Sequence, residues 1–349
     1  MPNEPFREPE HVSTYRTGPP PVPGAAEPKV RSLATVAFAP APAPEPRPLP
    51  AGANVWRAEE LLDLGYNARA IKRMLATSVL VRVRYGCYIR GKFWENLKKP
   101  VRSRILVFTH NYGTLTTSPG RMVYTHSSAA RLHHLFLWDV DERIHLTQRT
   151  KPSSDAHGSD VACHTRPLPA TDVITIEGIL TTTLERTAVD CGLSLSYRQA
   201  LIVMDHALRK GADKHKMVLM AKGLTGHRGV RNLRLVLENA DARSESPGET
   251  LSRDLFRKLC IPVPVSQFAV TSRAGKHRLD FAWQEKRVAM EFDGKIKYFD
   301  YKPTDEAIFE ERRREKALME DGWRFVRVEW KDLFLERQFK ARILAALAT

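Results

Sequence analysis

The chain has 349 residues, of which 42% are hydrophobic, and a formal net charge of +15 with a pI of about 9.8. This length suggests two or three domains, and the positive charge favours polyanionic partners, nucleic acid first. The four cysteines form no CxxC pair, so they offer no zinc site. The sequence has no apolar run that could span a bilayer and no secretory signal at its start. We therefore expect a cytoplasmic protein with no membrane contact.

Residues 1–50 hold 14 of the 23 prolines, in runs such as PPPVP and APAPAPEPRPLP. Such a segment buries too little apolar surface to fold, so we predict a disordered or polyproline-II tail. A role as a simple linker is favoured over partner binding.

Residues 51–99 predict two short helices followed by a hairpin. The first helix is expected from Trp56 to Leu64 and the second from Asn67, a plausible N-cap, to Ala76. In the stretch SVLVRVRYGCYIRG the alternation of valine and arginine predicts a strand with one basic face, which turns at Tyr85-Gly86.

This front module is basic, with twelve Lys/Arg against four Asp/Glu between residues 57 and 104. Helix, helix and basic hairpin is the pattern of a winged helix-turn-helix, in which the second helix enters the major groove and the wing contacts phosphates or the minor groove. The alternative is a solvated basic face on a structural module. The predicted DNA-binding residues are Arg69, Lys72 and Arg73 on the helix and Arg82 and Arg84 on the wing.

The stretch VWRAEELLDLGYNARAIKRMLATSVLVRVRYGCYIRG resembles the N-terminal DNA-binding domain of AbiEi-type antitoxins. In residues 100–243 the segments THSSAARL, RIHLTQ and TTTLERTAVD are similar to the region that follows it in that family. The resemblance implies that the module binds operator DNA, that the middle region supports the fold or contacts a partner, and that a cognate toxin is the protein partner.

The middle region otherwise predicts ordinary elements. Ser127 or Ser128 is expected to cap a helix, because no GxSxG elbow accompanies it. Thr182 and Glu185 have the spacing of a capping box on the helix that follows.

Residues 244–349 predict an α/β unit with a strand-rich centre, so the fold class is multidomain α/β. The expected order is helix 247–259, strands 263–271, 278–283 and 287–293, helix 304–321, strand 324–329 and a C-terminal helix.

Two acids stand out in the hairpin KHRLDFAWQEKRVAMEFDG. With a two-residue turn at Glu285-Lys286, one apolar face is made by Leu279, Phe281, Trp283, Val288, Met290 and Phe292. On the other face Asp280 lies directly opposite Glu291, with Cβ atoms about 5 Å apart. Like charges so placed repel unless a cation lies between them or one is protonated.

Opposed carboxylates with oxygen ligands suit a hard ion, so we predict a Mg²⁺ site, with Mn²⁺ as a substitute, at Asp280, Glu291 and Asp293. Lys295 and Lys297 would share this face if the strand continues past Gly294, and a lysine there can stabilise charge on a phosphate. The alternative is a surface hairpin with solvated acids.

Two flanking helices contribute further candidates. Ser246, Pro247 and Glu249 predict a capping box, which alone accounts for Glu249, although this residue also borders the apolar stripe facing the sheet. In the helix 304–321, Glu311 and Arg314 lie on the inward face. They form either a structural ion pair or part of the active site.

The C-terminal region is similar to the very-short-patch-repair (Vsr)-like branch of the PD-(D/E)xK nucleases. The similarity rests on the helix of Glu249 followed in order by the motifs LDFAW, VAMEFDGKIKY and EERRREKALMEDGWRFVRV. This resemblance implies a restriction-endonuclease-like fold that hydrolyses DNA with Mg²⁺. It matches Asp280 and Glu291 to the core metal-binding acids and Glu249 to the acid of the first helix. Asp293 occupies the place of the motif's lysine, and Lys297 falls where related sequences often place a histidine.

The sequence therefore favours a DNA-binding protein with a Mg²⁺-dependent endonuclease-like domain. The replaced lysine favours an alternative, a non-enzymatic AbiEi-like antitoxin or repressor with an inactive nuclease fold. A third reading is a defence or mobile-element nuclease whose front domain recognises a partner protein.

Overall fold

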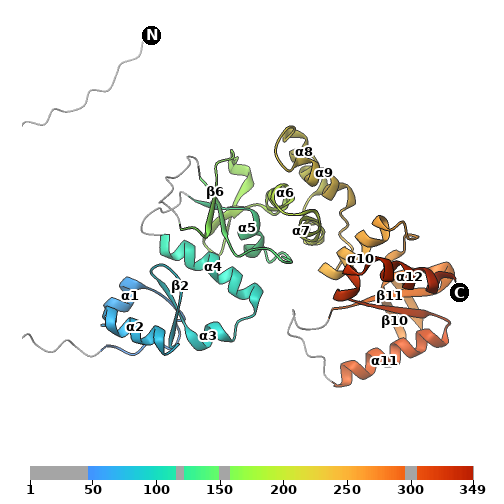
Figure 1. Cartoon of the computed structure of the whole chain (residues 1–349), viewed down its shortest axis with the longest axis horizontal. Coiled ribbons are helices and arrows are strands. Elements are labelled where there is room, and N and C mark those ends of the chain that lie inside the picture. Colours follow the sequence, from blue (N-terminus) through green and yellow to red (C-terminus); the bar gives the residue numbers. More distant parts are fainter. Residues whose placement is uncertain (1–45, 115–121, 149–157, 295–304, 349) are drawn as a thin grey trace, which may run out of the picture. The chain divides into compact units, whose positions relative to one another are not determined.

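The computed structural model describes residues 46–114, 122–148, 158–294 and 305–348 (Figure 1). Within these ranges the strands form three separate sheets joined by helices, so the chain is a multidomain mixed α/β protein. Most of the proline-rich segment 1–50 lies outside the described residues, and so do Lys295 and Lys297. No helix among the described residues is long and apolar enough to cross a membrane.

The front module has the predicted order of helix, helix and hairpin, with an additional first strand. Its elements are β1 (Val55–Arg57), α1 (Ala58–Asp63), α2 (Ala68–Ala76), β2 (Leu80–Arg84), β3 (Cys87–Arg90) and α3 (Gly91–Glu95), and the sheet order is β1-β3-β2. The predicted start of the first helix is wrong, because Trp56 lies in β1 opposite Tyr88. Its indole is only 4% exposed in the small core of this module, and this burial outweighs local helix propensity.

The buried residue of β2 is Leu80, which stands outside the valine–arginine alternation. Leu80 is 1% exposed and joins the core, whereas Val79 is 45% exposed. The strand carries apolar residues on both faces, so alternation alone does not decide which face is buried. A register irregularity between Arg82 and Arg84 further breaks the alternation.

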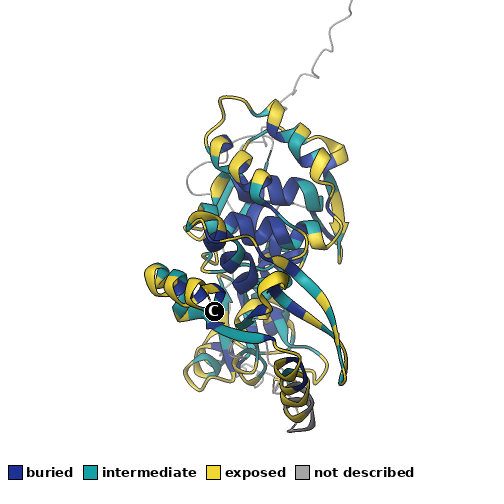
Figure 2. Cartoon of the chain, turned by 90° about the vertical axis from the view of Figure 1, so that its right-hand side faces the viewer, coloured by how far each residue is buried: buried dark blue, intermediate teal, exposed yellow. Residues whose placement is uncertain are grey.

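The middle region combines a five-stranded sheet, in the order β6-β5-β4-β8-β7, with a group of helices. Its elements are α4 (Lys99–Thr114), β4 (Val123–Tyr124), α5 (His126–Leu132), β5 (Ile144–Thr147), β6 (Val161–His164), β7 (Val173–Ile176), β8 (Ile179–Thr182), α6 (Leu184–Ser194), α7 (Tyr197–Arg209), α8 (Lys214–Gly223) and α9 (Val230–Asn239). All seven residues of α5 are buried, and buried residues are also the majority in α6 and α7. Figure 2 shows dark blue, buried helices near the middle of the view.

Two helix starts in this region differ from the prediction by one to three residues. Helix α5 begins at His126, and its N-cap is Thr125 rather than a serine. Ser128 is instead buried and its hydroxyl accepts a hydrogen bond from the His145 backbone N–H at 2.8 Å. Helix α6 is capped by Thr183, whose hydroxyl accepts from the backbone N–H of Arg186.

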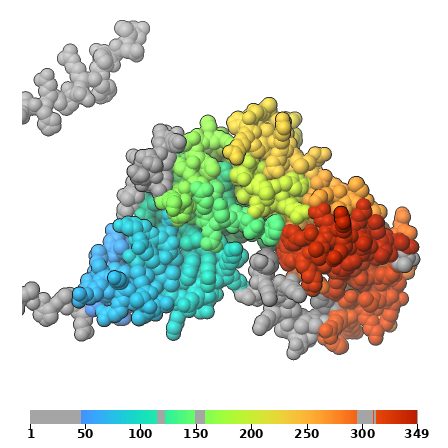
Figure 3. Space-filling model, in the orientation of Figure 1, coloured from blue at the N-terminus to red at the C-terminus, as the bar shows by residue number. Residues whose placement is uncertain are grey.

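The C-terminal region follows its predicted order closely. Its elements are α10 (Pro247–Lys258), β9 (Val265–Ser272), β10 (Gly275–Trp283), β11 (Val288–Asp293), α11 (Asp305–Glu320), β12 (Arg324–Glu329) and α12 (Glu336–Ala348). The sheet order is β12-β11-β10-β9, with β11 and β12 parallel and the other pairs antiparallel. Described residues between 247 and 348 make up the orange and red part of the space-filling view (Figure 3).

Apolar clusters cover both faces of this sheet. Phe281 and Met290 pack with residues of α10 and α12 on one face, while Ala282 and Ala289 pack with residues such as Leu318 of α11 on the other. The prediction that Leu279 shares the face of Phe281 is wrong, since Leu279 belongs to the cluster of α11. In the partner strand Gln267 has a φ of 54°, which interrupts the regular pleat opposite Asp280.

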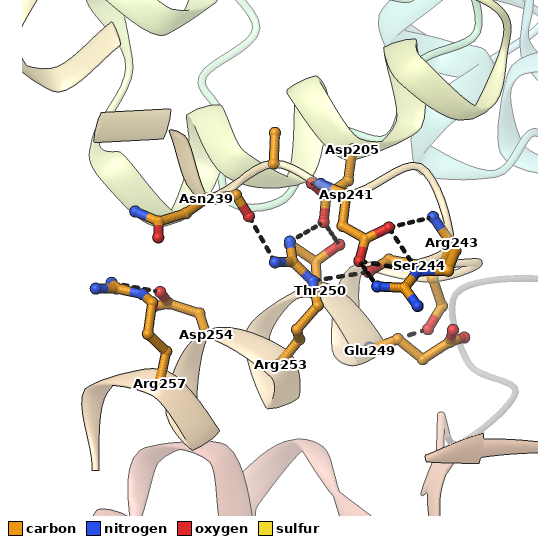
Figure 4. A network of polar contacts seen from close by, with 12 residues as sticks. Asp205, Asn239, Asp241, Arg243, Ser244, Glu249, Thr250, Arg253, Asp254 and Arg257 are labelled. Carbon is orange, nitrogen blue, oxygen red and sulfur yellow. Dashed lines mark hydrogen bonds and ion pairs between the residues drawn. The ribbon is translucent and has the colours of Figure 1, made fainter. Parts of the chain in front are cut away.

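A polar network joins α10 to α7 of the middle region (Figure 4). Asp205 is 1% exposed, and its Oδ2 accepts hydrogen bonds from Arg253 Nη2 at 2.7 Å and from the Thr250 hydroxyl at 2.8 Å. Its Oδ1 accepts from the backbone N–H of Asp241 at 2.8 Å. Ile202, also on α7, lies in the same apolar cluster as the α10 side chains. The two helices are therefore held by both polar and apolar contacts.

We expect Asp205→Ala to lower the free energy of unfolding by about 3–5 kcal/mol, because it leaves the Arg253 guanidinium without its counter-charge. Urea denaturation followed by circular dichroism would measure this. Arg243→Ala is the matched control, because the Arg243 side chain is 59% exposed where it pairs with Asp241 and should contribute at most about 1 kcal/mol. Equal losses in the two variants would contradict a dominant role for the buried pair.

Candidate active site

The hairpin of β10 and β11 has the predicted register. Trp283 pairs with Val288, Ala282 with Ala289, and Phe281 with Met290. The ladder ends there, because the Oδ2 of Asp280 accepts the hydrogen bond of the Phe292 backbone N–H at 2.9 Å. This side-chain contact takes the place of a ladder bond, so the strands end their pairing where the acids lie.

Asp280 and Glu291 meet as predicted, through a hydrogen bond between their carboxyl groups. Burial and the adjacent charge of Asp280 raise the pKa of Glu291 to about 9. Burial also raises the pKa of Asp280, but the Phe292 N–H and the hydrogen bond from Glu291 oppose this shift. Burial and the mutual repulsion of the two carboxyls therefore both favour a proton shared within the pair.

A third acid, Glu249, projects from the first turn of α10. It is 6% exposed, and its Oε2 accepts hydrogen bonds at 2.8 Å from the Glu245 backbone N–H and from Gln267 Nε2. Burial and the charge of Asp280 raise the pKa of Glu249 to about 7. Ser246 caps the helix as predicted, accepting from the Glu249 backbone N–H at 3.2 Å. The reciprocal bond of Glu249 goes to Glu245, one residue before the cap.

Close packing brings the start of α10 against β11. A Cβ on Gly248 would lie 1.9 Å from the Phe292 ring, so no larger residue fits there without displacing the ring. The absence of a side chain at this position lets the helix that carries Glu249 approach the strand that carries Glu291.

Asp293 was predicted to be a metal ligand, but in the structure its carboxylate pairs with an arginine. Its Oδ1 accepts a hydrogen bond from Arg327 Nη1 at 2.7 Å, and the other end of this guanidinium pairs with Glu315 Oε2 at 2.6 Å. Arg327 lies in β12 as the ladder partner of Glu291. A cation that sequence reasoning missed thus stands next to the acid pair, on the neighbouring parallel strand.

The remaining predicted site residues are placed as follows. Arg314 lines the cavity described below and is exposed, and the neighbouring Glu315 makes the ion pair with Arg327. Glu311 lies within α11, but its side chain is outside the described part of the structure. Lys295 and Lys297 fall in the segment that is not described, so their proposed roles stay predictions.

A cavity of about 1090 Å³ opens over these groups, and its walls include Glu249, Asp280, Glu291, Asp293 and Arg327. The acids supply only oxygen donors, the set that Mg²⁺ prefers. Two acids that share a proton can exchange it for a cation, because the ion removes their repulsion. The donor set therefore fits Mg²⁺ at Asp280 and Glu291, while one oxygen of Asp293 is already engaged by Arg327.

The predicted DNA-binding residues of the front module divide into two groups. Arg69, Lys72 and Arg73 are all exposed on α2, and their spacing puts them on one face of that helix. Arg82 is exposed on β2 near the ring of Tyr85. Arg84, in contrast, forms an ion pair with Asp160, and its side chain is only 14% exposed. Contrary to the prediction, its guanidinium is therefore not available to bind phosphates.

Comparison with known proteins gives relatives but no family. No family model matches the chain. Two Mycobacterium tuberculosis proteins, the uncharacterized protein MT2308 of strain CDC 1551 / Oshkosh and the uncharacterized protein Rv2248 of strain ATCC 25618 / H37Rv, are each 28% identical over 175 residues. The match covers 50% of this chain and 62% of each relative.

Among solved structures, a match is the crystal structure of the RV2827C protein from Mycobacterium tuberculosis. It matches with a TM-score of 0.36 and 12% identity, over 63% of this chain and 84% of that chain. None of these names states an activity, so we infer the function from the side chains described above.

Proposed function

We propose that the protein binds DNA and hydrolyses its phosphodiester bonds with Mg²⁺ at the site of Asp280 and Glu291. The observation that carries this proposal is the buried, proton-sharing pair of carboxyls at the floor of an open cavity. A structural role alone accounts poorly for the pair, because burying two acids costs stability even when they share a proton, and a cation bound between them would offset that cost.

Each side chain of the site has a role that its surroundings support. Asp280 and Glu291 would hold Mg²⁺, which supplies positive charge to the scissile phosphate when bound. Glu249 exchanges a proton near neutral pH and can accept one from the attacking water. Arg327 provides a fixed positive charge beside Glu291, a position from which it can take over the electrostatic role of the motif's missing lysine.

The experiment that tests the activity is a cleavage assay on supercoiled and linear DNA with the full chain in a titration of Mg²⁺ or Mn²⁺. We expect nicking or cutting that requires the divalent ion and stops when EDTA is added. DNA that stays intact at all metal concentrations, while the protein is folded by circular dichroism, would contradict the proposal.

The front module supports DNA binding through α2. We expect the triple variant R69A/K72A/R73A to bind duplex DNA about 10–100-fold more weakly. We also expect a smaller slope of log Kd against log salt concentration, because up to three fewer phosphates are neutralised. Fluorescence anisotropy at several salt concentrations would measure both effects.

Two controls sharpen this test. Arg84→Ala should change affinity less than the triple variant, because Asp160 already engages that guanidinium. Lys222→Ala removes an exposed charge of α8 and reports the effect of net charge alone. An equal loss of affinity in Lys222→Ala and in the triple variant would show that α2 is not the contact surface.

A second function, a DNA-binding repressor without cleavage, is favoured by one observation. By the resemblance to the nuclease motif, Asp293 occupies the place of its lysine, and the Asp293 carboxylate pairs with Arg327. A gel-shift assay with the DNA upstream of the coding region distinguishes the two functions. Tight, sequence-specific binding without metal-dependent cleavage would select the repressor.

A further inference from the structure

Three histidines far apart in the sequence converge in the middle region, away from the carboxyl pair. His126 is the first residue of α5, His145 lies in β5 and His164 ends β6. One ring nitrogen from each lies within 4.8 Å of those of the other two. Among the described residues, this is the group of three or more His, Cys, Asp or Glu side chains whose ligand atoms all lie close enough together to share one ion.

The spacing of these nitrogens is close to that of a metal site. His145 Nδ1 and His164 Nε2 are 3.1 Å apart. Two imidazole nitrogens on a tetrahedral Zn²⁺ are separated by roughly 3.3 Å, from Zn–N bonds of about 2.05 Å. The ring of His126 stacks on that of His164, with centroids 3.8 Å apart. The His126 ring would have to rotate out of this stacking to direct its nitrogen at the same ion.

The backbone and the outer contacts hold His126 in this place. Its φ is 51°, a left-handed conformation that a residue with a side chain rarely adopts, and it is only 7% exposed. Its Nδ1 makes a hydrogen bond of 2.9 Å with the hydroxyl of Thr125, which also receives a hydrogen bond from Thr147. This contact orients the ring and leaves Nε2 for a ligand, as outer-shell hydrogen bonds do for metal-binding histidines.

We propose that His126, His145 and His164 form a binding site for a transition-metal ion of the Zn²⁺ class. Three neutral imidazoles suit Zn²⁺, Co²⁺ or Ni²⁺ and not Mg²⁺, which prefers oxygen. With three protein ligands, a fourth position is left for water or an anion. Arg143 and Arg166 lie near His164 and favour an anionic fourth ligand. The site is distinct from the carboxyl pair in both donor type and place.

The test is equilibrium binding of Zn²⁺ and Co²⁺ to the full chain in excess Mg²⁺, which occupies oxygen-donor sites. We expect one Co²⁺ per chain, with the strong visible absorption of a four- or five-coordinate ion. His145→Gln and His164→Gln should each weaken Co²⁺ binding at least 100-fold. His215→Gln is the matched control, because this exposed histidine of α8 lies outside the group.

A Glu291→Gln variant separates this proposal from the proposed function, since it removes a carboxyl of the other site and should keep the bound Co²⁺ and its spectrum. Retention of the spectrum in His164→Gln, or no binding by the wild-type chain, would overturn the inference. The wild-type spectrum itself reports the coordination number, and a weak six-coordinate spectrum would overturn the inference even if a histidine variant fails to fold.

Discussion

Glu291→Ala is expected to lower metal-dependent DNA cleavage by about a thousandfold. A bound divalent ion contributes several kcal/mol to the stabilisation of charge in phosphoryl chemistry, and each factor of ten in rate corresponds to about 1.4 kcal/mol. The substitution removes the Glu291 carboxylate, so Asp280 would be the one remaining acid of the pair to bind the ion. Initial rates of nicking of supercoiled DNA, at saturating Mg²⁺ and with equal protein concentrations, would measure the effect.

Glu285→Ala is the matched control, because Glu285 is an exposed acid in the turn of the same hairpin. Its cleavage rate should remain within a factor of two of the wild-type rate. Glu291→Gln provides a second check, because it removes the charge and keeps the shape. We expect this variant to lose cleavage while its unfolding midpoint stays the same or rises, since the contact between two acids is relieved. Equal cleavage by Glu291→Ala and the wild-type chain would refute the assignment of the site.

The affinity of the site for Mg²⁺ is expected to rise about tenfold for each pH unit between pH 6 and 8. The ion must displace the proton of Glu291, whose pKa is raised to about 9 by burial and by Asp280. The rise should level off as the pH passes that value. Isothermal titration calorimetry with Mg²⁺ or Mn²⁺ at several pH values would measure the slope and the release of about one proton per ion.

The same proton gives the ion-free protein a defined pH dependence of stability. The folded pKa of Glu291 lies above its ordinary value of 4.5, so the folded state binds more protons than the unfolded state between about pH 4.5 and 9. The contribution of this group to the free energy of unfolding therefore decreases as pH rises through that window. Glu291→Gln should flatten both this trend and the pH slope of ion affinity. An unchanged slope in that variant would show that another group releases the proton.

Much of the hairpin at the site could be predicted from sequence, because its determinants are local. The apolar alternation of Phe281 and Trp283 with Val288 and Met290, and the short turn between them, leave one register that buries both strands. That register brings Asp280 to Glu291. The same reasoning failed at Leu279, because the irregular backbone of Gln267 lies on the neighbouring strand β9 and leaves no signal in the hairpin itself.

Arg327 could not be assigned from the hairpin, although its strand was predicted. It reaches Glu291 through a parallel pairing that spans the helix α11, and parallel register has no turn to fix it. Its engagement of Asp293 depends on that register as well. Trp56 shows the corresponding limit in the front module, since a pairing with Tyr88 some thirty positions away converts an expected helical residue into a strand residue.

The network around Asp205 has a practical consequence for dividing this chain into pieces. A fragment that begins at Ser244 would contain Arg253 but not Asp205, the carboxylate that Arg253 binds. It would also expose to solvent the apolar surface that Ile202 covers. A fragment that begins ahead of α7 retains both partners. Recombinant expression of the C-terminal region for crystallisation or assay should therefore start no later than Ser196, where the side chain that caps α7 is also kept.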